Sequence, residues 1–342
     1  MTLNIQDFVR ALPKAELHLH LEGTVNATTL VELSRRVDPK PMTLEEAEAV
    51  YDYTDFTGFI NAFHIVAKKM AGPGEYELVT TRMIEQLAAA GVVHAEVYLS
   101  VGELFRARKT TRETDGEVFL NTMEAIERAR IQGEQDHGVS IYWLMDSSRQ
   151  EGLQEAERVF HTSEKFRTRY PSIIGLGLGG DERVHASEPF RALYAEAGKL
   201  GMRLTNHAGE NTPASFIWEA LSIGSERLGH VCSAIEDPAL LEELARRQIP
   251  VELNPTSNVR LGNCASFKDH PLRKLFDMGI LVTLNSDDPG FFGSSVANEY
   301  CLAHTEQHFT RDELKKLACN SFIGSFLSSD AKAKWIEAVA AV

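Results

Sequence analysis

The chain is poor in cysteine and has no long apolar segment. Its four cysteines show no CxxC spacing, so no disulfide framework is indicated. The opening residues, MTLNIQDFVRALPK, contain no apolar run of the kind found in a signal peptide. No stretch of about 18 apolar residues, the length that crosses a membrane, occurs anywhere. We therefore expect a cytoplasmic protein with reduced thiols.

Positive charge is also scarce. The chain has 35 lysines and arginines against 49 aspartates and glutamates, a net charge of −14 at pH 7. Nucleic acid and anionic membranes would both be repelled by such a chain. We expect neither as a partner and favour a small-molecule ligand. The sequence does not determine the oligomeric state.

What the chain does contain is a regular alternation of strand and helix patterns. The segments predicted as strands are 15–22, 92–100, 140–147, 173–180, 203–208, 227–231, 250–256 and 280–287. Helical patterns separate them, with extra helices inserted after the first strand and at the C-terminus. Eight strands in this rhythm predict an α/β fold, a (β/α)8 TIM barrel, with residues 1–342 forming one domain.

The first predicted strand, AELHLHLE, carries two histidines one residue apart. Leucines alternate there with Glu16, His18, His20 and Glu22, a period of two. Histidines at i and i+2 of a strand point the same way, so both can reach one cation. A polar strand face without metal is the alternative, and the strand alone does not decide between the two.

Polar residues end several other predicted strands, and strand ends converge on one face of such a barrel. These residues are Gly180, Asp181 and Glu182, then His207 and Glu210, then His230, then Asp287 and Asp288. The alternatives are buried structural histidines and a simple turn at 287–288.

Three histidines and a carboxylate suit zinc and leave a position for water. The candidate ligands are His18, His20, His207 and Asp287. Zinc would lower the pKa of that water. Glu210 lies outside this set and could move a proton, while His230 could orient or deprotonate the water.

The insertion after the first strand is rich in aromatic residues. In a barrel it would lie over the C-terminal ends of the strands, where it could form a lid. A plain helical packing layer is the alternative. We expect Phe56, Phe59 and Phe63 to lie nearest a ligand.

Five fragments together resemble the adenosine/adenine deaminase family. They are ELHLHLEG at 16–23, GGDE at 179–182, HAGE at 207–210, GH at 229–230 and NSDDP at 285–289. Each is weak alone, but the five occur in order across most of the chain. The resemblance implies a zinc barrel of the amidohydrolase superfamily with one Zn²⁺ per chain. Such an enzyme replaces the 6-amino group of a purine with oxygen and releases ammonia.

The resemblance also implies a role for each matching residue. His18, His20, His207 and Asp287 match the zinc ligands. Glu210 matches the group that protonates purine N1, and His230 the residue that handles the attacking water. Asp288 matches the carboxylate facing N7, and the backbone N–H of Gly180 the donor to N3. We also expect His20 and Glu22 to contact substrate.

The 5′ side of the substrate stays open. Glu22 replaces an aspartate common in adenosine deaminases of this type, whereas GGDE favours nucleosides over adenine. A further option is 6-aminodeoxyfutalosine, an intermediate of menaquinone synthesis that carries a carboxylate, for which an arginine is the suited partner. Arg149, Arg106 and Arg108 are candidates, with surface arginines as the alternative. We expect a 6-aminopurine nucleoside, with adenine or 6-aminodeoxyfutalosine as alternatives.

Two other functional classes compete. One is a two-metal hydrolase on the same barrel, which usually has a bridging lysine, but none of the third to fifth strands ends in lysine. The other is a purine-binding protein without catalysis, although Glu210 and His230 are both present. The zinc deaminases with an HxE and PCxxC signature do not fit, because no cysteine pair has that spacing.

Overall fold

Eight parallel strands form the centre of the molecule in the order β1 to β8. The computed structural model describes residues 3–54 and 56–342, without the side chains of residues 56 and 57. The strands are β1 (Lys14–His20), β2 (Val92–Ser100), β3 (Ser140–Ser148), β4 (Ile173–Gly179), β5 (Arg203–Ala208), β6 (Arg227–His230), β7 (Val251–Leu253) and β8 (Val282–Leu284). A parallel bridge between Leu19 and Asp287 joins the two ends of the sheet. The predicted (β/α)8 barrel is confirmed.

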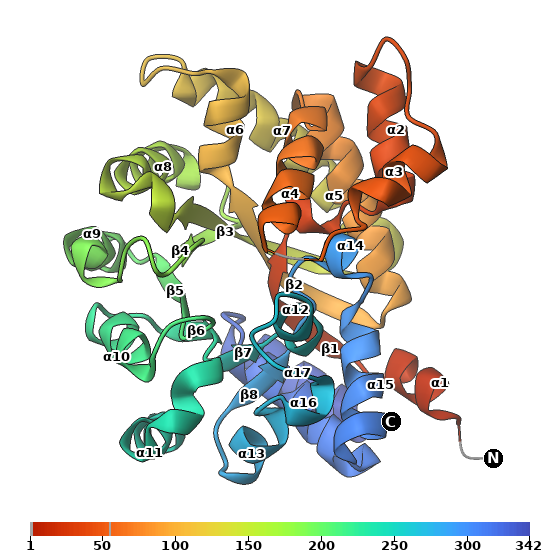
Figure 1. Cartoon of the computed structure of the whole chain (residues 1–342), viewed down its shortest axis with the longest axis vertical. Coiled ribbons are helices and arrows are strands. Elements are labelled where there is room, and N and C mark those ends of the chain that lie inside the picture. The colour runs from red at the N-terminus through yellow and green to blue at the C-terminus, as the bar shows by residue number, and fades with distance from the viewer. Residues whose placement is uncertain (1–2, 55) are drawn as a thin grey trace.

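Helices surround the strands (Figure 1). The first part of the chain contributes α1 (Ile5–Ala11), α2 (Ala27–Val37), α3 (Leu44–Val50), α4 (Phe56–Lys69), α5 (Pro73–Ala89), α6 (Val101–Arg108), α7 (Asp115–His137) and α8 (Leu153–Arg167). The second part contributes α9 (Arg191–Lys199), α10 (Ala214–Ser222), α11 (Pro238–Arg247), α12 (Pro255–Arg260), α13 (Leu272–Asp277), α14 (Pro289–Phe292), α15 (Val296–Gln307), α16 (Arg311–Gly324) and α17 (Ser329–Ala340). Short 3₁₀ helices are η1 (Glu22–Thr24), η2 (Arg149–Glu151), η3 (Glu188–Phe190), η4 (Cys232–Glu236) and η5 (Phe267–Asp269).

Three strands end two or three residues earlier than the sequence pattern predicts, while β4 and β6 end one residue earlier. β1 stops at His20 because Glu22 begins a 3₁₀ turn. β7 stops at Leu253 because Pro255 opens α12, and proline suits the first turn of a helix. β8 stops at Leu284, and Asp287 beyond it has a left-handed φ of 65°. Each shortening leaves polar residues on loops at the strand ends, where side chains can turn toward a common centre.

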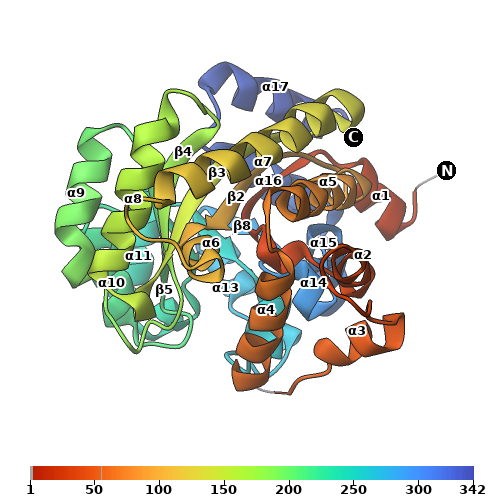
Figure 2. The same ribbon diagram turned by 90° about the horizontal axis from the view of Figure 1, so that it is seen from above.

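The inserted helices cover one end of the barrel. In Figure 2, α3 and α4 lie at one end of the molecule and α17 at the other. A capping box of Thr43 and Glu46 begins α3. Phe59 of α4 stacks on Phe292 of α14 with ring centroids 5.5 Å apart. This aromatic contact fixes the insertion against the segment that follows β8.

In the described part of the chain, no helix is both long enough and apolar enough to cross a membrane.

Candidate metal centre and active site

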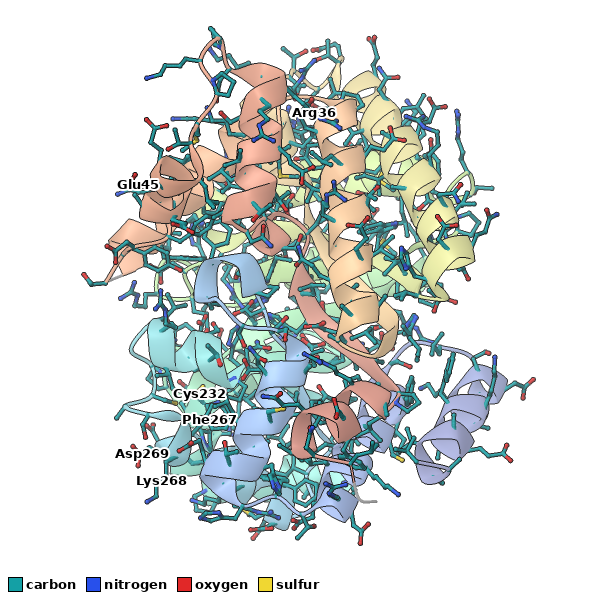
Figure 3. The ribbon with its side chains drawn as sticks, turned by 90° about the vertical axis from the view of Figure 1, so that its right-hand side faces the viewer. Arg36, Glu45, Cys232, Phe267, Lys268 and Asp269 are labelled. Carbon is teal, nitrogen blue, oxygen red and sulfur yellow. The ribbon has the colours of Figure 1, made fainter. Side chains whose placement is uncertain are left out.

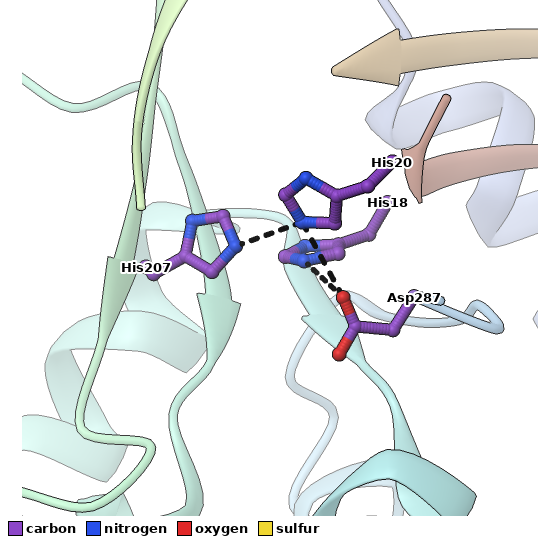
Figure 4. Close-up of side chains that lie close together, drawn as sticks. All are labelled: His18, His20, His207 and Asp287. Carbon is purple, nitrogen blue, oxygen red and sulfur yellow. Dashed lines mark hydrogen bonds and ion pairs between the residues drawn. The ribbon is translucent and has the colours of Figure 1, made fainter. Parts of the chain in front are cut away.

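The four predicted metal ligands meet at one point (Figure 4). One ligand atom from each of His18, His20, His207 and Asp287 lies within 4.8 Å of the other three. Nε2 of His20 is 3.3 Å from Nε2 of His207 and 3.4 Å from Oδ1 of Asp287, and Nε2 of His18 is 3.3 Å from the same oxygen. Neighbouring ligands on a tetrahedral zinc with bonds of 2.0–2.1 Å lie about 3.3 Å apart. The residues therefore fit a zinc ion.

The unsatisfied atoms point to the same conclusion. Nε2 of His18 is buried and makes no hydrogen bond, although buried polar atoms normally have a partner. The Nε2 atoms of His20 and His207 face each other, and His207 is 5 % exposed. A cation bound among these nitrogens satisfies all three.

Backbone geometry brings the ligands together. His18 and His20 point to one side of β1 because side chains alternate along a strand. Asp287 reaches them from the far end of the sheet, where its N–H donates to the carbonyl of His18 at 3.1 Å. Gly229 of β6 leaves room for the His18 ring, since a Cβ there would lie 2.6 Å from its Cε1.

Glu252 of β7 orients His18, a role that the sequence pattern did not predict. Its Oε2 lies 2.7 Å from Nδ1 of His18, on the side of the ring away from the centre. Arg227 forms buried ion pairs with both Glu252 and Glu96. A carboxylate on the outer nitrogen of a metal-binding histidine fixes its tautomer and strengthens it as a ligand. The one sequence feature that hinted at this role is the acidic residue in the middle of the otherwise apolar β7, VEL.

Glu210 lies at the edge of this centre. Its burial, followed in importance by the charge of Asp287, raises its pKa from 4.5 to about 8. Asn263 donates to its Oε1 at 3.2 Å. Glu182 fixes the turn before it, accepting the N–H groups of Gly209 at 2.7 Å and Glu210 at 2.9 Å. Glu210 is thus a positioned carboxyl group whose burial favours the protonated form.

His230 ends β6 beside Glu210, with its Nδ1 3.9 Å from Oε1 of Glu210. Burial lowers its pKa to about 3, so the ring is neutral. Its Nε2 lies 4.0 Å from Oδ2 of Asp287, and its Nδ1 lies 3.0 Å from Nδ2 of Asn258. His230 itself has a left-handed φ of 66°. This conformation is uncommon outside glycine and turns the imidazole toward the metal ligands.

A cavity of about 380 Å³ opens onto these groups. Its polar wall includes His20, His207, Glu210, His230, Asp287, Asp288 and Gly180, and its apolar wall includes Phe59, Ile60, Phe63, Val184 and Leu261. The predicted placement of Phe59 and Phe63 beside a ligand site agrees with this cavity, while the side chain of Phe56 lies outside the described residues.

Glu22 lies behind the cavity. It is buried, and its Oε1 accepts the N–H of Ser100, which does line the cavity, at 3.2 Å. Its Oε2 makes no hydrogen bond. Burial raises the pKa of Glu22 to about 7. Because Oε1 is already bonded, a contact between Glu22 and a ligand would involve Oε2.

Arg149 does not face the cavity, contrary to the sequence-based expectation. Its side chain is fully buried, and its guanidinium donates to the side chain of Asn206 and the carbonyl of His207. The other two candidate arginines also have partners within the protein: Arg106 pairs with Glu103 and Glu151, and Arg108 donates to the carbonyl of Ala71. The sequence shows that Arg149 lies close to the end of β3, but it does not show in which direction the long side chain points.

Comparison with known proteins places this arrangement in a family. The family model described as "Adenosine deaminase" matches residues 13–342. An adenine deaminase of Wolinella succinogenes is 31% identical over 338 residues, covering 98% of this chain and 99% of that protein. An aminodeoxyfutalosine deaminase of Streptomyces avermitilis is 34% identical over 335 residues, covering 97% of this chain and 91% of that protein. The crystal structure of an adenine deaminase from Arthrobacter aurescens superposes with a TM-score of 0.88 at 30% identity, covering 96% of this chain and 98% of that one. The chain therefore belongs to the adenosine deaminase family.

Proposed function

We propose that this enzyme removes the 6-amino group of a 6-aminopurine nucleoside by hydrolysis, giving the 6-oxo purine and ammonia. Family membership makes the chain a hydrolytic deaminase. The observation that carries the proposal is the placement of Glu210, a buried carboxyl group with a raised pKa, in a cavity that opens onto the candidate zinc site. Purine deamination needs both an acid at the ring and an activated water at C6.

Each residue of the cavity has a role in this reaction. A bound Zn²⁺ supplies an activated water at neutral pH. Glu210 donates its proton to purine N1, which makes C6 electrophilic. His230, whose Nε2 faces Asp287, orients the attacking oxygen. Asp288 faces N7, and the backbone N–H of Gly180 donates to N3.

The shape of the cavity supports a nucleoside over free adenine. The polar wall can hold a purine ring, and the apolar wall formed by Phe59, Phe63 and Val184 extends the cavity further. Free adenine would leave this apolar wall without a contact. The cavity size lies within the range for sites that bind small organic ligands.

A second candidate substrate is 6-aminodeoxyfutalosine. The apolar wall suits its aryl group, and the relative from Streptomyces avermitilis carries that name. Its carboxylate, however, would need a cation, and the described residues that line the cavity include no lysine or arginine. The lining instead includes Glu103, Asp146 and Glu151. We therefore place the neutral nucleoside first.

The test is a comparison of adenosine, adenine and 6-aminodeoxyfutalosine with the zinc-loaded enzyme. Turnover is followed by the change in purine absorbance and, independently, by ammonia release. We expect kcat/KM to be highest for adenosine. A higher value for either of the others would replace the nucleoside assignment, and no turnover of all three would refute the proposed function. The Glu210→Gln variant controls for a contaminating deaminase.

A further inference from the structure

Outside the catalytic centre, two cysteines and a histidine converge from separate segments. Cys232 begins η4 directly after β6, Cys264 lies between α12 and η5, and His270 follows η5. Their two Sγ atoms and one ring nitrogen of His270 all lie within 4.8 Å of one another. Figure 3 shows Cys232 and the neighbouring residues 267–269. Cys264 and His270 are six residues apart, and the fold brings the more distant Cys232 to them.

The chemistry of this cluster is that of a soft-metal site. Thiolate sulfur binds zinc at about 2.3 Å and a neutral imidazole at about 2.0–2.1 Å. Burial lowers the pKa of His270 to about 3, so its ring is neutral. A hydrogen bond between the two thiols raises the pKa of Cys232 and lowers that of Cys264. Cys264, the more exposed of the two, is therefore the first to ionise.

The surroundings of His270 match those of a metal ligand. Its Nε2 lies 3.1 Å from Oδ1 of Asn258, a contact of the kind that fixes the ring of a metal-binding histidine through its outer nitrogen. Its Nδ1 accepts only the backbone N–H of Leu272, at 3.2 Å. A cation on Nδ1 would displace this one contact, so the N–H of the buried Leu272, at the start of α13, would need another acceptor.

We propose that Cys232, Cys264 and His270 form a second metal site, for a thiophilic divalent cation such as Zn²⁺ or Cd²⁺. Binding releases the protons of both thiols, and a water takes the fourth ligand position. The bound site is then neutral overall, because two thiolates balance the charge of the cation. Cys264 is partly exposed and offers the route of entry.

Such a site would hold the segment that supports the catalytic residues. Asn263, next to Cys264, donates to Glu210. Asn258 lies between His270 and His230, with one end of its amide near each ring. A cation bound at 232, 264 and 270 would tie this segment to the end of β6. Metal binding here does not depend on the proposed deaminase activity.

The test is titration of the zinc-loaded enzyme with Cd²⁺ under reducing conditions. Binding should give the ultraviolet absorbance band of a cadmium thiolate and raise the melting temperature, because a ligand of the folded state stabilises it. Cys232→Ser and Cys264→Ser should abolish both effects. Cys301→Ser and Cys319→Ser are matched controls, since these partly buried thiols lie outside the cluster and should leave both effects intact.

Three results would overturn the proposal. They are no thiolate band in the unmodified enzyme, a band that persists in Cys264→Ser, and loss of the band on Cys301→Ser. Circular dichroism of each variant checks folding, and His270→Gln gives a variant with both thiols intact that should bind Cd²⁺ more weakly. Loss of two mass units without added metal under non-reducing conditions would assign the cysteines to a disulfide pair instead.

Discussion

Nδ2 of Asn258 lies 3.0 Å from Nδ1 of His230. An amide nitrogen can only donate, so Nδ1 of the neutral imidazole accepts and the ring proton sits on Nε2. Nε2 is the nitrogen that faces Asp287, at 4.0 Å. Asn258 therefore selects the tautomer of His230 that presents an N–H to the attacking oxygen. The other end of the same amide is fixed by His270.

Replacing Asn258 should impair catalysis without weakening substrate binding. In Asn258→Ala the tautomer of His230 is no longer fixed, and we expect kcat to fall about 100-fold, the lower end of what a positioned acid–base group contributes. Asn258→Asp should be worse, because an acceptor at this position favours the opposite tautomer. Asn254, at 3.4 Å from the same nitrogen, is the matched control and should matter less. Steady-state measurements of kcat and KM for the variants at 258 and 254 test this prediction. A rise in KM as large as the fall in kcat would contradict it.

Glu210→Gln should abolish most of the activity while leaving the fold intact. Glutamine keeps the size and the hydrogen bond with Asn263 but has no proton to give. We expect kcat to fall by about 10²–10⁴-fold with little change in KM, the range for loss of a general acid. Zinc content measured on the same sample should be unchanged. Full activity would show that another group protonates the ring.

The pH profile should report the same proton. Burial raises the pKa of Glu210 to about 8 in the metal-free protein, and a nearby cation lowers it again. The acid form is active, so kcat should fall as pH rises through a pKa between about 4.5 and about 8 in the loaded enzyme, while protonation of the histidine ligands limits activity at low pH. Measuring kcat across this interval should give a single-proton decline. In Glu210→Gln the residual activity should lack that decline.

Removing the metal should remove the activity. Dialysis against a chelator should abolish turnover, and Zn²⁺ should restore it. The number of zinc ions should be measured in the Cys232→Ser/Cys264→Ser double variant, because it lacks the second proposed metal site. We expect one zinc per chain in that variant. Two ions per chain in that variant would favour the two-metal hydrolase instead. Glu252→Gln, which removes the charge behind His18, should weaken zinc binding by about 10–100-fold in a competition with a chelator.

Arg149 should matter for stability and not for substrate choice. Arg149→Met leaves the acceptors on Asn206 and His207 unpaired in a buried site, and we expect a loss of about 2–5 kcal/mol in the free energy of unfolding. Denaturant unfolding measures this. The ratio of kcat/KM for 6-aminodeoxyfutalosine over adenosine should stay the same. If kcat/KM fell for 6-aminodeoxyfutalosine but not for adenosine, Arg149 would instead be a substrate-binding residue.

The sequence was informative where the chemistry follows local spacing. Alternation in β1 put His18 and His20 on one side, and strand order put His207 and Asp287 at the same end of the barrel. It was uninformative where a contact depends on side-chain direction or on pairing across the barrel. Glu252 lies behind His18 but belongs to β7, six strands later in the chain. A long arginine just past β3 can turn inward as easily as outward. The cysteine cluster was missed for a similar reason, since no local spacing brings residues 232, 264 and 270 together.

The Leu19–Asp287 bridge has a consequence for biosynthesis. The nitrogens of β1 leave the ribosome early, but the carboxylate that completes the ligand set follows the last strand, more than 250 residues later. A nascent chain can therefore acquire its full coordination only when the ring of strands shuts. Tight binding of a metal by all four residues would therefore require that synthesis has passed residue 287 and that the two ends of the sheet have met.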